Sequence, residues 1–119
     1  MRRLIAAGIV LIAVLTLSIS GSFIVGKTEK EVLKRCEEIL LAPDSEKIES
    51  FEKYWSKKSL PLSFFVNREN IEEIGNLSAK MRSAGKNEDK EEIFESAEQI
   101  KFVISHVAEA ESLSLLSFF

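Results

Sequence analysis

The sequence has 119 residues, which is enough for one small domain. Arg2 and Arg3 are the only charged residues before Lys27, and the rest of the chain carries 14 basic and 19 acidic residues. This acidic remainder lacks the positive field that binding to a phosphate backbone requires, so nucleic acid is not an expected partner. Cys36 is the only cysteine, which excludes an intrachain disulfide.

The first element is an apolar segment of 23 uncharged residues between Leu4 and Gly26. As a helix it would be about 34 Å long, and the hydrocarbon core of a bilayer is about 30 Å thick. We therefore predict a transmembrane helix in residues 1–26, followed by a helical domain in residues 27–119. The bilayer is then the first expected partner of the chain.

Orientation and processing of this segment depend on its flanks. Arg2 and Arg3 favour an N-terminus inside the cell, which gives a single-pass protein of the cytoplasmic membrane with its helical domain outside. The alternative is a secretory signal cleaved after the small residues of Ser18-Ile19-Ser20. The apolar run is longer than the 7–15 residues typical of a signal peptide, which favours an uncleaved anchor.

A second helix is predicted after Gly26. Thr28 and Glu31 have the spacing of a capping box, which indicates a helix start at Thr28. In the alternative interpretation, the apolar helix continues through Lys27 without a break. In both cases one apolar stripe follows the helical period: Val32, Leu33, Cys36, Ile39 and Leu40.

Pro43 is expected to end this helix, and Asp44 or Ser45 to cap the next. The apolar face of that next helix contains Ile48, Phe51 and Trp55. The segment Ser59-Leu60-Pro61 predicts a turn, and we interpret the apolar run 62–66 after it as a helical turn packed into the core.

Asn67 is expected to cap a third helix of the domain and Gly85 to stop it. Its predicted inward residues are Ile71, Ile74, Leu77 and Met81. Asn87 is expected to open the last helix, whose predicted face is Ile93 or Phe94, Ala97, Ile100, Ile104 and Val107. The apolar tail 113–119 is too short to span a membrane and is expected to cover the end of the bundle or to rest on lipid.

The inventory of reactive side chains predicts no catalytic, cofactor-binding or metal site. His106 is the only histidine, and one histidine three residues from Glu109 does not make the paired Glu-x-x-His ligands of helical metal centres. Cys36 lies on an apolar stripe and is expected to pack as a small hydrophobic residue.

Two groups of residues are candidates for protein interaction. Tyr54 and Trp55 are of the types enriched at interface centres, although Trp55 at helical spacing from Phe51 also fits a core position. Ser18, Ser22 and Gly26 recur at every fourth position of the apolar segment, a spacing that allows close approach of another helix.

The chain resembles a bacterial family known only as domain of unknown function 4363, found mostly in Clostridia and their relatives. The resemblance covers nearly the whole chain. It rests on the Arg-led apolar start, on Trp55 with the run 62–74, and on His106 with the run 109–115. Members tend to have histidine at the position of Arg68, so no histidine-based chemistry carries over. The resemblance implies a small, anchored, helical protein without an assigned activity.

Together these observations predict an all-α protein, with a transmembrane helix followed by a small antiparallel bundle of about four helices. The expected function is a non-enzymatic module that binds another protein at the outer face of the cytoplasmic membrane. The alternatives are a small accessory subunit of a membrane complex, in contact through Ser18, Ser22 and Gly26, and a secreted helical protein after signal cleavage.

Overall fold

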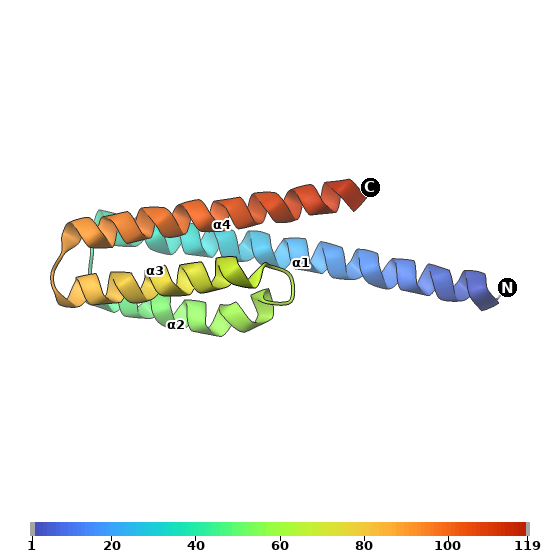
Figure 1. Ribbon diagram of the computed structural model, residues 1–119, viewed down its shortest axis with the longest axis horizontal. Coiled ribbons are helices and arrows are strands. Elements are labelled where there is room, and N and C mark those ends of the chain that lie inside the picture. Colours follow the sequence, from blue (N-terminus) through green and yellow to red (C-terminus); the bar gives the residue numbers. More distant parts are fainter. Residues whose placement is uncertain (1, 119) are drawn as a thin grey trace.

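The computed structural model describes the backbone of residues 2–118, and the side chains in this range except 17, 18, 20, 22 and 111–118. Within it the chain forms four helices and no strand: α1 Arg2–Leu41, α2 Ser45–Leu62, α3 Arg68–Lys86 and α4 Lys90–Phe118. The helices alternate in direction (Figure 1). Each one packs against two others, in the closed order α1, α2, α3, α4 and back to α1. The predicted all-α antiparallel bundle is therefore confirmed.

Helix α1 is continuous from the apolar segment into the bundle. Its 40 residues give it a length of about 60 Å, and its first half projects beyond α2 and α3, while only its N-terminal part also extends past the end of α4 (Figure 1). The predicted helix start at Thr28 is wrong, and the continuous alternative is correct. Thr28 lies inside the helix and is only 4% exposed, between the buried Val25 and Val32. The backbone N–H groups after Thr28 donate to carbonyl groups of the preceding helical turn, so no side-chain cap is needed there.

This continuity changes the predicted organisation. The anchor segment and the first helix of the bundle are one element, and the described chain has four helices in total. When only the described residues are considered, no helix contains a stretch that is both long enough and apolar enough to cross a membrane.

The core lies between all four helices. The predicted apolar stripes face this core: Phe51, Met81 and Ile100 are fully inaccessible, whereas Leu33, Leu40 and Ile71 are only partly buried. Burial of one such side chain stabilises the fold by about 1.5–3 kcal/mol. The remaining buried apolar residues are Val25, Val32, Cys36, Ile39, Ile48, Trp55, Leu62, Ile74, Leu77, Ala84, Ile93, Ala97, Val103, Ile104 and Val107.

Two predicted helix starts are confirmed. The Asp44 carboxylate accepts a hydrogen bond from the N–H of Glu46 at 3.2 Å, at the start of α2. The Asn67 amide oxygen accepts one from the N–H of Glu69 at 3.1 Å, at the start of α3. These caps satisfy N–H groups that have no partner within their own helix.

The predicted turn at Ser59-Leu60-Pro61 is wrong, because α2 continues to Leu62. Proline has no backbone N–H and therefore cannot donate a helical hydrogen bond. Pro61 lies in the last turn of α2, and the helix ends one residue later, at Leu62. The chain then makes a further helical turn, in which the N–H groups of Phe65 and Val66 both donate to the carbonyl of Leu62. Leu62 is buried as expected, whereas Phe64 is 79% exposed.

The turn between α3 and α4 also differs from its prediction. Gly85 lies within α3, and a Cβ there would meet the Cδ1 atom of Ile48 at 3.2 Å, so this glycine allows close packing and does not stop the helix. The left-handed position that ends α3 is occupied by Glu88, with φ of 55°. Asp89, and not Asn87, caps α4, since its carboxylate accepts from the N–H of Glu92 at 3.2 Å.

Candidate functional site

A partly apolar groove of about 420 Å3 lies between α1 and α2. It lies at the end of the bundle from which the apolar half of α1 projects. Its lining residues are Phe23, Ile24, Lys27, Thr28 and Glu31 of α1, and Tyr54, Lys57, Lys58, Pro61 and Leu62 of α2. Helices α1 and α2 have the least extensive of the four interfaces, which leaves room for this groove.

Arg35 contacts two residues of the groove lining, Tyr54 and Glu31. Its guanidinium lies 4.6 Å from the centre of the Tyr54 ring, a distance typical of a cation–π contact. Its Nε donates to the Glu31 carboxylate at 2.9 Å, and its Nη1 donates to the hydroxyl of Ser50 at 3.0 Å. Burial, and then the nearby Glu31 carboxylate, raise the pKa of Tyr54, so the phenol stays neutral at physiological pH.

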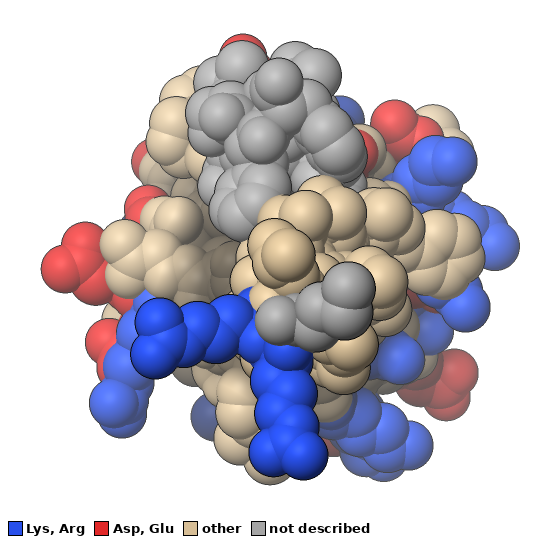
Figure 2. Space-filling model, turned by 90° about the vertical axis from the view of Figure 1, so that its right-hand side faces the viewer, with Lys and Arg blue, Asp and Glu red and all other residues tan. Residues whose placement is uncertain are grey.

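The rim of the groove is cationic. Lys27, Lys57 and Lys58 are all exposed, and none of them forms an ion pair with another described residue. The only carboxylate in the lining, on Glu31, is paired with Arg35. Figure 2 looks onto this end of the molecule and shows Lys and Arg side chains at its centre, at its lower left and along its right-hand side, with Asp and Glu side chains on both sides.

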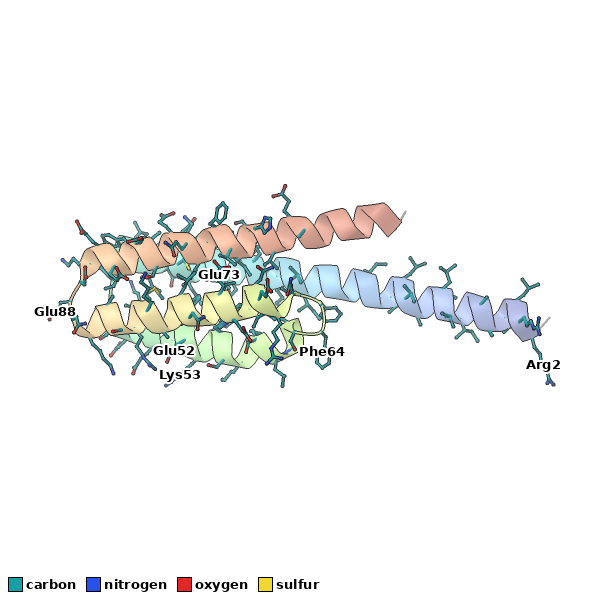
Figure 3. The ribbon with its side chains drawn as sticks, viewed as in Figure 1. Arg2, Glu52, Lys53, Phe64, Glu73 and Glu88 are labelled. Carbon is teal, nitrogen blue, oxygen red and sulfur yellow. The ribbon has the colours of Figure 1, made fainter. Side chains whose placement is uncertain are left out.

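The turn between α2 and α3 lies next to the groove. Phe64 points away from the bundle at this end, opposite to the end that carries Glu88 (Figure 3). Phe65 packs in the other direction, against α1: a Cβ added to Gly21 would meet the Cδ1 atom of Phe65 at 2.6 Å. The absence of a side chain at Gly21 therefore lets the turn rest directly on α1.

The two aromatic candidates occupy different environments. Tyr54 is half-buried and lines the groove. Trp55 is only 5% exposed and belongs to the core. This outcome agrees with the core position that its helical spacing from Phe51 also allowed. In this conformation only Tyr54 is accessible to a ligand or partner.

The small-residue stripe of the apolar segment is described only in part. The side chains of Ser18 and Ser22 lie outside the described residues. Gly26 is half-exposed, and a Cβ added there would meet no atom within 4 Å. The surface of α1 at Gly26 is therefore open.

Cys36 is fully buried in α1, as predicted. Burial raises the pKa of its thiol to about 12. Because the thiolate is the reactive form, we expect native Cys36 to react with iodoacetamide at pH 8 about a thousandfold more slowly than in the unfolded chain. The rate of alkylation with and without denaturant measures this difference. Equal rates would contradict the burial of Cys36.

The same pKa shift predicts a pH dependence of stability. The folded-state pKa lies above the unfolded value of about 9, so the stability that the neutral thiol contributes is fully present below pH 9. It is lost as the pH rises toward 12. The Cys36→Ala variant lacks this contribution, and its unfolding midpoint should fall less than that of the parent chain between pH 9 and 11.

His106 and Glu109 are both exposed on α4. Among the described residues, no group of three or more His, Cys, Asp or Glu side chains is close enough to hold a metal ion. The structure therefore brings neither residue into a cluster with the other candidates.

The groove was not among the predicted sites. Its cationic residues come from two helices, with Lys57 lying 30 positions after Lys27, and only the neighbouring pair Lys57 and Lys58 is visible as a local signal. Their proximity to Lys27 depends on α1 continuing unbroken past Gly26.

Short loops, alternating helix directions and one shared core define this chain as a small up-and-down helical bundle. Residues 43–117, more than half of the chain, match the family described as Domain of unknown function (DUF4363), and the chain belongs to that family. The predicted resemblance is thus confirmed, over α2, α3 and nearly all of α4, whereas the apolar start lies outside the match. No curated protein and no solved structure matches the chain.

Proposed function

We propose that this protein is a non-enzymatic helical module that α1 holds at the outer face of the cytoplasmic membrane, where the bundle binds another protein. The observation that carries the proposal is the apolar surface of the projecting half of α1. Large apolar side chains there are exposed: Leu4, Ile5, Ile9, Val10, Leu11, Ile12, Ile19 and Phe23. An apolar surface of this extent on a soluble protein marks a contact with a membrane or a partner.

The length of the apolar segment supports a membrane contact. Leu4 to Gly26 is free of charge in the printed sequence, including the four positions 17, 18, 20 and 22 whose side chains lie outside the described residues. Such a helix is as long as the hydrocarbon core of a bilayer is thick, and its last turns, with Gly21 and Val25, also pack against the bundle. Because α1 has no break at Gly26, the bundle would stand directly on the membrane surface.

The side chains of the bundle support a role without catalysis. The thiol of Cys36 is buried and neutral, and His106 stands alone on an exposed helix surface. A nucleophile needs a neighbouring base and an orienting group.

Thiol labelling in intact cells tests the anchor and its orientation. Lys86 is exposed at the end of the bundle far from the apolar segment, so Lys86→Cys in a Cys36→Ala background should react with a membrane-impermeant maleimide. The matched Arg2→Cys variant, which keeps Arg3 as the orienting charge, should react only after lysis.

Each other outcome identifies a different error. Labelling of Lys86→Cys only after lysis would reverse the orientation. Release of the protein from membranes by alkaline carbonate would exclude a spanning helix. A mature N-terminus near Gly21 would establish a cleaved signal and a secreted protein.

An accessory subunit that associates through its membrane helix is the second candidate, favoured by the open surface at Gly26. Replacing residues 4–26 with an unrelated apolar helix of equal length separates the two candidates. Capture of the partner by the swapped chain after crosslinking favours binding by the bundle, and loss of capture in a folded swapped chain favours association through α1.

A further inference from the structure

The groove between α1 and α2 combines two surfaces that usually occur apart. Its walls are apolar at Phe23, Ile24 and Leu62, and its rim carries three ammonium groups. Mixed grooves of this kind suit a ligand with a compact negative charge attached to a hydrocarbon chain. The acidic composition of the bundle makes three unpaired lysines at one site notable.

The groove also lies next to the apolar segment, where the proposed membrane insertion would bring it into contact with lipid. Phe23 and Ile24 belong to the last turns of the apolar segment, and Lys27 is the first charged residue after it. Under the proposed membrane insertion, the apolar end of the groove would therefore be level with the acyl chains and its lysines with the phosphates. Leu60 and Phe64, both exposed beside the groove, would face the same interface.

Charge complementarity selects one class of lipid. The positive rim attracts a headgroup with net negative charge, and a zwitterionic headgroup offers an ammonium group that the lysines repel. Each lysine close to an anionic lipid surface improves binding by about fivefold. Lys27, Lys57 and Lys58 together therefore account for a preference of about 125-fold, of which Lys57 and Lys58 contribute about 25-fold.

We propose that the groove between α1 and α2 binds an anionic phospholipid, with its phosphate oxygens accepting hydrogen bonds from Lys27, Lys57 and Lys58 and one acyl chain along Phe23 and Ile24. This inference rests on the proposed membrane insertion of α1. It adds a lipid-selective contact that would fix the bundle against the bilayer.

Photocrosslinking of the full chain tests the proposal. p-Azidophenylalanine replaces Tyr54, which lines the groove, in protein reconstituted into vesicles of equal phosphatidylglycerol and phosphatidylcholine. Mass spectrometry should find phosphatidylglycerol attached in about 125-fold excess. The excess should fall to about fivefold in the Lys57→Gln/Lys58→Gln variant, which keeps Lys27, and persist in the matched Lys86→Gln/Lys90→Gln variant, whose lysines are exposed at the other end.

Two further probe positions separate this inference from the proposed function. A probe at Ile9, within the apolar segment, should crosslink both lipids in the ratio of the vesicles, and a probe at Phe102, exposed on α4, should crosslink neither. No lipid at Ile9 would overturn the membrane insertion itself. Lipid at Ile9, with none or an unselected mixture at Tyr54, would overturn only the lipid site.

The lysine variants also need a folding control and a test of the ligand. Lys57 and Lys58 are exposed, so the thermal midpoint followed by circular dichroism should match that of the parent chain. Added glycerol 3-phosphate, which has the phosphate without acyl chains, should leave the crosslink unchanged. If it abolishes the crosslink, the groove binds soluble phosphate compounds and the lipid assignment is wrong.

Discussion

Replacing Ile100 by alanine should lower the free energy of unfolding by about 2–5 kcal/mol, because the variant loses apolar burial and leaves a cavity. Ile100 is fully buried in the middle of α4, in the core that it shares with Phe51 and Ile74. Small domains have only about 5–15 kcal/mol of stability, so the loss is a large part of the total. Denaturant unfolding of the detergent-solubilised chain, followed by the fluorescence of Trp55, measures it.

Phe102 provides the matched control for this experiment. It lies two residues further along the same helix and is 75% exposed, so Phe102→Ala should change the stability by less than about 0.5 kcal/mol. An effect of Phe102→Ala as large as that of Ile100→Ala would mean that α4 presents a different face to the core.

Replacing Lys27 by proline should destabilise the protein by about 3 kcal/mol or more. Lys27 is exposed and lies in the interior of α1, so its substitution tests the helix and not the core. Proline removes a backbone hydrogen bond and clashes with the preceding turn, and the resulting kink would displace the buried Val25 and Thr28.

Lys27→Ala is the control, because alanine removes the charge and keeps the helix; its stability should stay close to that of the parent chain. If Lys27→Pro and Lys27→Ala unfold at the same denaturant concentration, the two halves of α1 are not joined by a helix that the bundle depends on.

The parts of the fold that could be predicted are those encoded by local patterns. The apolar stripe of α1 from Val32 to Ile39 and that of α2 from Ile48 to Trp55 follow the helical period and are buried. Asp44 and Asn67 were recognisable as caps because an acceptor side chain directly precedes a periodic run.

The errors arose where one residue type serves two purposes. A threonine followed three residues later by glutamate signals a helix start, yet Thr28 also fits the interior of a helix when its neighbours Val25 and Val32 continue the same buried stripe. Glycine usually ends a helix, whereas Gly85 is needed beside Ile48 and Glu88 takes the left-handed position. Only tertiary contacts decide between such uses.

The candidate site was beyond prediction for a related reason. Tyr54 was recognised as a candidate from its residue type, and it does line the groove. The cluster of Lys27 with Lys57 and Lys58 depends on the register between α1 and α2, which no short motif of either helix specifies.

The closed order of the four helices has a consequence for folding kinetics. Three of the four interfaces join helices that follow one another in the sequence across short loops, and they form early because little chain entropy is lost. The α1–α4 interface joins the two helices that are most distant in the sequence, and it is about as extensive as the α3–α4 interface. A ribosome delivers α4 after the other three helices, so the ring closes only once α4 has emerged. Until then the apolar face of α1, with Val32, Cys36 and Ile39, would lack α4, the helix with which α1 shares its larger interface. We therefore expect closure of the ring to be the slow step of folding and the step most prone to misassembly.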